Sequence, residues 1–332
     1  MNARRDFLIA LGAGALAAPL ASFAQQQRKV WRIGVLAPTA SDSKPGEPNP
    51  YALAFLAEMQ AAGLAFGVDY VIETRYADGD YERLPALANE LVRLNVDILM
   101  PVSPVAARAA QKASATLPIV FIGVPDPVGL GMAASLARPG GNLTGLASFY
   151  AELIPKQLEL LKSIVPKATR VAFLANASIE KGTAAEQTVR GIMQKLGMRL
   201  QIVSVESAEQ LPRAFAAMTR ERAGAFIALA DASFVRDRRQ IAELALKHRL
   251  PSFFANRENV QAGGLVSYGE NIVELFAQAA RYVGKIMKGA RPADLPIEQP
   301  TKFHLAINRR TAAALKLSIP PELLVRADEV IE

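Results

Sequence analysis

The residues best placed for chemistry in this sequence are polar side chains that directly follow short apolar runs. Asp126 follows the run Ile119 to Gly123, which is typical of a strand buried on both faces. Ligands of open α/β sheets bind at the carboxyl ends of the strands. A carboxylate there can pair with an ammonium group or accept hydrogen bonds from hydroxyls, so we predict that Asp126 binds a solute. The alternative is an Asx-turn that closes the loop.

Ser103 ends another apolar run and precedes Pro104 and a predicted helix that starts at Val105. Its hydroxyl, the free backbone N–H groups and the helix dipole favour binding of a ligand carboxylate. Capping of the helix is an equally good interpretation, and the two roles are compatible. Thr39, at the end of the first strand, is a candidate for solute contact or for capping the loop that follows.

Two tyrosines lie where the chain is predicted to pass between lobes. Tyr150 follows the last strand of the first lobe and can stack on a ligand or pack in a hinge. Tyr268 precedes Gly269 and fits a hinge better than a contact surface. Both are kept as candidate ligand-binding residues.

The second half of the chain repeats the pattern of polar residues after strands. Asn176 and Asp231 occupy equivalent strand ends, and we expect Asp126 to face them across the cleft. Arg257 and Glu258 follow the Phe253-Phe254 strand and are further candidates. The alternative for this last pair is a salt bridge between the two side chains.

Enzymatic chemistry is weakly supported. Residues 129–134 match G-x-G-x-x-A after a strand, but the Pro125-Asp126-Pro127 turn intervenes and would place a carboxylate opposite a pyrophosphate. The sequence has no G-x-S-x-G elbow, Walker loop or H-E-x-x-H motif, and His248 and His304 are too far apart to suggest a metal pair or a triad. We therefore expect no catalytic residue, no metal and no cofactor.

The elements that position these residues alternate between strand and helix. A first series runs from Val30 to Ser148, with a short helix predicted over 132–137, and a second runs from about 155 to 268. The predicted fold class is α/β, with two Rossmann-like lobes whose parallel sheets are joined by hinge crossovers. The predicted domains are 1–24, a twin-arginine signal peptide; 30–148 plus 271–290, the N-terminal lobe; and 149–270 plus 295–332, the C-terminal lobe.

The N-terminus predicts export. Arg4-Arg5 precedes an apolar stretch over 8–20 and the small-x-small site Ser22-Phe23-Ala24, so we expect twin-arginine export and cleavage near Ala24. The alternative, an uncleaved amphipathic helix, is disfavoured by the glycines and proline of this segment. The chain has no cysteine, and therefore no disulfide or lipid-anchoring thiol. A periplasmic location is expected.

Composition limits the class of partner. With 332 residues, 51% of them hydrophobic, the chain can bury one large or two medium cores. The formal net charge is +7, but the basic residues are spread over many predicted helices without interleaved aromatics. We expect no nucleic-acid partner.

Several segments resemble one family. The chain is similar over about 30–331 to the ABC-importer substrate-binding proteins that include tryptophan- and tyrosine-binding members. The resemblance implies a type I periplasmic binding protein fold with three crossovers, a ligand enclosed when the lobes close, and no catalysis. The segments that carry it are R-Y-A-D-G-D-Y-E-R-L-P-A-L-A-N-E-L-V (75–92), V-D-I-L (96–99), P-I-V-F (118–121), D-P-V-G-L-G (126–131), S-L-A-R-P-G-G-N-L-T-G (135–145), A-G-G-L-V-S-Y-G (262–269) and L-P-I-E-Q-P-T-K-F (295–303).

These observations predict the periplasmic solute-binding component of an ABC importer. It would capture a small amino-acid-like or aromatic organic solute in the inter-lobe cleft and deliver it to a membrane permease. We expect a monomer that is not embedded in the membrane. The alternatives are an exported dinucleotide-dependent oxidoreductase and a sensory module that presents a bound ligand to a receptor.

Overall fold

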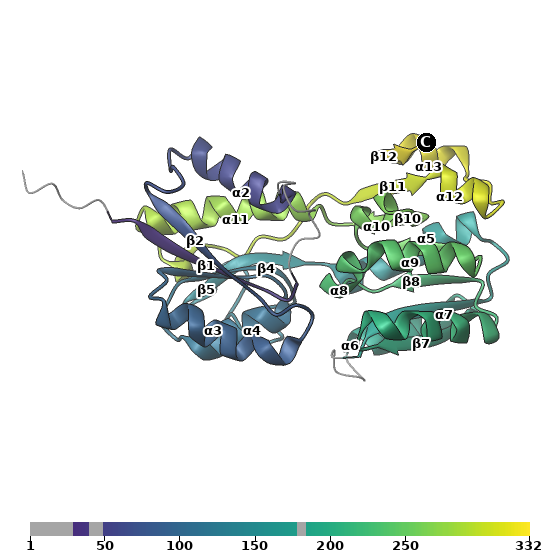
Figure 1. The fold of residues 1–332 in the computed structure, drawn as a ribbon, viewed down its shortest axis with the longest axis horizontal. Coiled ribbons are helices and arrows are strands. Elements are labelled where there is room, and N and C mark those ends of the chain that lie inside the picture. The colour runs from purple at the N-terminus through teal and green to yellow at the C-terminus, as the bar shows by residue number, and fades with distance from the viewer. Residues whose placement is uncertain (1–28, 40–48, 178–183) are drawn as a thin grey trace, which may run out of the picture. The chain divides into compact units, whose positions relative to one another are not determined.

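The computed structural model describes residues 29–39, 49–177 and 184–332 (Figure 1). The predicted signal peptide, residues 1–24, lies outside the described residues. The chain from Trp31 to Glu332 forms one compact unit. Two α/β lobes make up this unit, each built around its own sheet.

The N-terminal lobe has a five-stranded parallel sheet in the order β2-β1-β3-β4-β5. Alternate side chains of β4 point to opposite faces of the sheet. Ile119 and Phe121 pack with the helices α3 and α4. Val120 and Ile122 pack with α2 and α11. The strand is therefore buried on both faces, as predicted. The elements are β1 (Trp31–Ala37), α2 (Pro50–Ala61), β2 (Tyr70–Tyr76), η1 (Tyr81–Arg83), α3 (Leu84–Arg93), β3 (Ile98–Pro101), α4 (Pro104–Ala113), β4 (Ile119–Pro125), β5 (Leu143–Ser148) and α11 (Ile272–Met287).

The short helix predicted over 132–137 is wrong. The segment forms turns, because the backbone N–H groups of Met132 and Ala134 donate to the carbonyls of Pro127 and Pro139. Gly131, with φ 68°, begins this departure from helical geometry. Met132 and Ala133 are still buried in the core on the side of α3 and α4.

The C-terminal lobe has a seven-stranded sheet in the order β12-β11-β10-β9-β8-β6-β7. All of its pairings are parallel except β10 with β11. The elements are α5 (Tyr150–Ile164), β6 (Arg170–Asn176), α6 (Ala184–Lys195), β7 (Arg199–Val205), η2 (Ala208–Gln210), α7 (Leu211–Arg220), β8 (Ala225–Ala228), α8 (Ala232–Arg236), α9 (Arg238–Lys247), β9 (Ser252–Phe254), α10 (Arg257–Gln261), β10 (Val266–Gly269), β11 (His304–Asn308), α12 (Arg309–Ala314), α13 (Pro321–Arg326) and β12 (Glu329–Ile331). The short helix η3 (Pro292–Asp294), which precedes β11 in the chain, packs against β5 and belongs to the N-terminal lobe.

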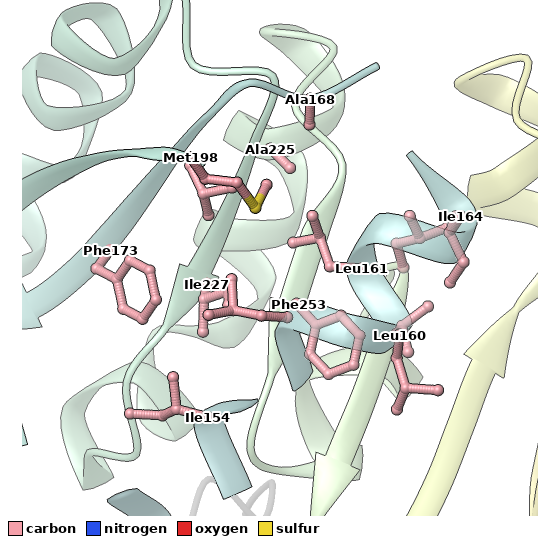
Figure 2. Packing of buried hydrophobic residues seen from close by; sticks show 14 of the residues in the cluster. Ile154, Leu160, Leu161, Ile164, Ala168, Phe173, Met198, Ala225, Ile227 and Phe253 are labelled. Carbon is pink, nitrogen blue, oxygen red and sulfur yellow. The ribbon is translucent and has the colours of Figure 1, made fainter. Parts of the chain in front are cut away.

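The core of this lobe also lies on both faces of its sheet. Figure 2 shows Phe173, Ile227 and Phe253, from β6, β8 and β9, packed against side chains of α5. Their neighbours in sequence point to the opposite face, where Phe226 meets Phe215 of α7 with ring centroids 5.1 Å apart. This alternation fixes the strand register, so the carboxyl ends of these strands emerge at one edge.

The chain passes between the lobes three times: after β5, after β10 and before β11. The backbone N–H of Phe149 in the first crossover donates to Glu270 Oε1 in the second at 2.5 Å. The Phe303 ring of the third lies 6.3 Å from Phe149 and 6.1 Å from Tyr268, centroid to centroid. The three crossovers are thus held together by side chains. No helix in the described ranges has the length and hydropathy of a membrane span.

Candidate functional site

Asp231 is the centre of one hydrogen-bonded cluster that joins the lobes. It follows β8 and caps α8, accepting from the backbone N–H of Ser233 at 2.9 Å and from the Ser233 hydroxyl. Tyr81 of the N-terminal lobe donates to Asp231 Oδ2 at 2.9 Å, and Asn176 Nδ2 donates to Oδ1 at 3.1 Å. Burial, and then the Asp231 charge, raise the pKa of Tyr81, so the phenol keeps its proton and acts as donor. We call these four residues the Tyr81 cluster.

Arg236 extends this connection toward the surface. Its guanidinium pairs with Asp237 through two nitrogens, each at 2.8 Å, and donates to the carbonyl of Asp78 in the N-terminal lobe at 3.1 Å. Gly79 makes this approach possible, because any side chain there would collide with the guanidinium. A groove of about 590 Å³ lies at this point, lined by 78–82 of one lobe and by 206–209 and 236–237 of the other.

A second cluster is centred on Tyr51, in the first turn of α2. Asn49 caps this helix, accepting from the backbone N–H groups of Tyr51 and Ala52 at 2.9 and 3.3 Å. The Tyr51 hydroxyl reaches the C-terminal lobe and donates to Glu258 Oε1 at 3.3 Å. Its ring stacks on Phe276 of α11, with centroids 5.3 Å apart and planes 21° apart. The position of the hydroxyl is therefore fixed by a cap and by an aromatic contact.

Tyr150 lies close to the same carboxylate. Burial raises its pKa most strongly, and the charges of Glu270 and Glu258 raise it further. Tyr51 contributes to the same shift, so the two phenols and Glu258 are neighbours. Both phenols therefore remain protonated at neutral pH and can donate.

The residues beside Glu258 hold donors without partners. Asn256 is only 4% exposed, and its Nδ2 has no hydrogen-bond partner among the described residues. Arg257 is half-buried and makes no hydrogen bond or ion pair with a described residue, although its charge acts on Tyr51. The alternative salt bridge between Arg257 and Glu258 is therefore not formed. We call Tyr51, Tyr150, Asn256, Arg257 and Glu258 the Tyr51 cluster.

Glu270 adds a buried acceptor in the crossover that follows β10. The side chain is 4% exposed, and its Oε2 has no hydrogen-bond partner among the described residues. Burial raises its pKa to about 7, even though the Phe149 N–H bond acts in the opposite direction; the charge of Glu152 adds to the rise. Gly269 brings this crossover against the backbone of Ala255, next to Asn256.

The remaining predicted site residues lie outside the two clusters. Ser103 caps α4, its hydroxyl accepting from the Ala106 N–H at 3.3 Å, and it adopts a strained φ of 98°. The Asp126 carboxylate is exposed and accepts from the backbone N–H of Gly129 in its own turn at 2.9 Å. This is the Asx-turn that the sequence pattern indicated as the alternative to solute contact. Tyr268 lies in the hinge, and Thr39 is half-buried. Their contact with a solute stays a prediction.

Sequence reasoning missed the residues that meet the C-terminal carboxylates from the opposite lobe. Tyr51 and Tyr81 lie in the first turn of helical segments rather than at strand ends: Tyr51 is two residues after the cap Asn49, and Tyr81 directly follows the cap Asp80. Such a capping signal after the loop of each βα unit places the next side chain at the same edge of the sheet as the strand ends. That signal was present in the sequence and identifies both tyrosines.

Comparison with known proteins places this fold in a family. The family model of ABC transporter substrate binding proteins matches residues 55–331. A curated tyrosine-binding protein of Clostridioides difficile is 23% identical over 278 residues, covering 83% of this chain and 80% of that protein.

Solved structures have the same fold. A conserved domain protein of Vibrio cholerae is 25% identical, with a TM-score of 0.81, and covers 91% of this chain and 100% of its own. An ABC domain of a Streptococcus pneumoniae protein in complex with L-tryptophan is 22% identical, with a TM-score of 0.79 and the same coverage. The chain therefore belongs to the family of ABC transporter substrate binding proteins, whose members bind solutes and are not enzymes.

Proposed function

We propose that this protein is the periplasmic solute-binding component of an ABC importer and captures an amino-acid-like or aromatic organic solute between its lobes. The observation that carries the proposal is the Tyr51 cluster. There the buried amide N–H of Asn256 and the half-buried guanidinium of Arg257 have no partner among the described residues and lie beside the carboxylate of Glu258 in the chain. Buried polar groups are nearly always hydrogen-bonded, so unpaired ones at a lobe junction point to a ligand.

The chemistry of the cluster favours a zwitterionic or aromatic solute. Glu258 and the two phenols can receive or donate hydrogen bonds, Arg257 supplies a positive charge, and the stacked Tyr51 and Phe276 rings supply an aromatic wall. The names of the relatives, a tyrosine-binding protein and a domain in complex with L-tryptophan, agree with this class. Ser103 and Asp126 remain proposed contacts from the N-terminal lobe.

Capture would proceed by closure about the crossovers. Three segments join the lobes, and hinge motions are absorbed by a few residues at such element ends. Hydrogen bonds to the solute would then form away from water, where they are strongest. The twin-arginine signal would direct the protein to the periplasm, and a membrane permease would receive the solute from a monomeric binding protein.

The test is ligand-induced stabilisation and compaction of the mature protein. Thermal unfolding and small-angle scattering would be measured with a panel of aromatic and branched amino acids, aromatic acids and purines, with glucose as the control. A solute at a hundredfold excess over its Kd adds about 2.7 kcal/mol, which raises the Tm by about 4 °C for a chain of this length. A panel in which no member changes either the Tm or the radius of gyration would contradict the proposal.

A further inference from the structure

Asn256 and Arg257 follow the carboxyl end of β9, two and three residues past its last residue, Phe254, which is buried like the intervening Ala255. Asn256 does not cap the helix that follows, although its backbone has the extended conformation of a capping residue. Its side chain is thus held in a buried position without the usual local role of such a residue. A buried amide N–H without an acceptor destabilises a protein, so a bound acceptor is the economical explanation.

Positive charge gathers at the same point. The guanidinium groups of Arg257 and Arg238 both act on the Tyr51 hydroxyl and oppose the rise of its pKa. Glu258 is the carboxylate that acts on that hydroxyl, and its Oε1 already accepts the hydrogen bond from Tyr51. Arg257 itself makes no hydrogen bond with a described residue. Its planar donor group matches the two oxygens of a carboxylate.

We propose that Asn256 and Arg257 form the subsite that binds a carboxylate of the solute, and that this protein therefore selects organic acids and amino acids over the corresponding amines. The inference rests on the proposed function and names the substrate class at the same site. In this arrangement Glu258, adjacent in sequence, takes the positive or hydroxyl-bearing end of the solute. The segment 256–258 after β9 would then bind both the carboxylate and the ammonium group of a zwitterion.

Ser103 is the alternative site for a solute carboxylate, and it differs from Asn256 and Arg257 in its hydrogen bonding. Its hydroxyl already accepts the N–H of Ala106 at 3.3 Å, so it is occupied as a cap. In the described part of the chain, neither the Asn256 side-chain N–H nor the Arg257 guanidinium has such a role. Replacing Ser103 by alanine removes a cap, whereas replacing Arg257 by glutamine removes a charge that binds nothing else among the described residues.

The experiment compares carboxylates with the amines that lack them. Isothermal titration calorimetry of the mature protein would use three pairs: L-tyrosine and tyramine, L-tryptophan and tryptamine, and L-leucine and 3-methylbutylamine. The wild type is expected to bind at least one amino acid and to bind its amine more weakly. Arg257→Gln should weaken binding of that amino acid roughly 10- to 100-fold, the range of a hydrogen bond to a charged group, and change binding of the amine less than about threefold.

Two further variants keep the test independent of folding. Arg257→Lys retains the charge but not the planar fork, so it should recover part of the lost affinity. Arg309→Gln, at an exposed pair with Glu332 in the C-terminal lobe, should change neither affinity. The Tm of each unliganded variant checks that the fold is intact.

The outcomes separate this inference from the proposed function. If Arg257→Gln leaves amino-acid binding unchanged, or weakens acid and amine alike, the carboxylate subsite is overturned while the solute-binding function stands. If Ser103→Ala gives the selective loss instead, the subsite is likewise overturned. If the wild type binds no member of any pair, the amino-acid-like class fails and the subsite fails with it.

Discussion

Two tyrosine–carboxylate hydrogen bonds join the lobes, and their surroundings differ. Tyr81 donates to Asp231, which also accepts from Asn176 and from Ser233, so its oxygens are surrounded by donors of the protein itself. Tyr51 donates to Glu258 at a longer 3.3 Å, beside the donors of Asn256 and Arg257, which have no partner among the residues that the structure describes. The first network is complete without a solute, and the second is not.

This difference separates a structural contact from a binding site. A buried network whose members are all satisfied rigidifies the arrangement that it joins. One that leaves donors unpaired destabilises the free protein, and the missing acceptor is then available from a ligand. We therefore regard the Tyr81 cluster as a contact that stabilises lobe closure, and the Tyr51 cluster as the place where the solute is recognised.

The largest effect is expected for Glu258→Gln. Glutamine keeps the oxygen that accepts from Tyr51 but removes the charge that would face an ammonium group. Loss of one partner of a buried charge pair costs about 2 to 5 kcal/mol, so the Kd for an amino acid should rise more than about 30-fold. Calorimetry with L-tyrosine and with 3-(4-hydroxyphenyl)propionate, which lacks the ammonium group, measures this. Equal loss for both ligands would contradict an ammonium contact.

Glu270 extends the comparison because its Oε2, near Tyr150, is a buried acceptor that has no hydrogen-bond partner among the described residues. Its pKa is raised to about 7 from the ordinary 4.5, so the folded protein holds this proton after the unfolded chain has lost it. Stability is fully present below about pH 4.5 and falls as the pH rises to 7, by up to about 3 kcal/mol.

Glu270→Gln removes this titration and keeps the oxygen that accepts from Phe149. The variant should therefore unfold at the same denaturant concentration as the wild type at pH 4 and at a higher one at pH 8. Chemical denaturation at both values measures this, with Glu274→Gln, on α11, as the matched control. If the midpoints of the variant and the wild type differ by the same amount at both pH values, the pKa of Glu270 is not raised in the folded protein.

Tyr81→Phe is expected to act more weakly. It removes one donor from Asp231, which retains Asn176 and Ser233, so about 1 kcal/mol of stability should be lost. The Kd should rise less than about fivefold, through easier opening of the lobes, and scattering should show an expanded unliganded state. A hundredfold loss of affinity at unchanged stability would instead make the Tyr81 cluster the solute site, as the sequence predicted for Asn176 and Asp231.

Sequence reasoning identified polar side chains that lie at the lobe junction, but not the side chains that meet them from the opposite lobe. The rule that ligands meet strand ends placed Asn176, Asp231 and Glu258 at the lobe junction, because strand register follows from alternating burial. The rule could not decide whether these polar side chains bind a solute or bind other side chains of the protein. That distinction depends on Tyr51 and Tyr81, whose approach is set by lobe geometry rather than by local pattern.

The unpaired donors were harder still to find from the sequence. Asn176 ends β6 and Asn256 follows β9 by two residues, yet Asn176 Nδ2 donates to Asp231 and Ser233 while Asn256 Nδ2 reaches no described acceptor. Two asparagines that both lie near the carboxyl end of a strand thus differ in whether their tertiary surroundings supply an acceptor. Glu270 is similar, because its burial arises where three crossovers meet.

Asp126 gives the smallest expected effect and the sharpest test of the comparison. Its carboxylate is exposed and already accepts the N–H of Gly129, so contact with a solute would compete with its own turn. Exposed charge interactions contribute about 0 to 1 kcal/mol, and Asp126→Ala should therefore raise the Kd less than about fivefold. Gly129→Ala provides a control, because a methyl group there would collide with the same carboxylate and disturb the turn without removing the charge. If Asp126→Ala abolishes binding while Gly129→Ala does not, the N-terminal lobe supplies a charged contact and recognition is shared between the lobes. If both variants bind the solute as the wild type does, Arg257 and Glu258 after β9 are the residues that recognise its charged groups.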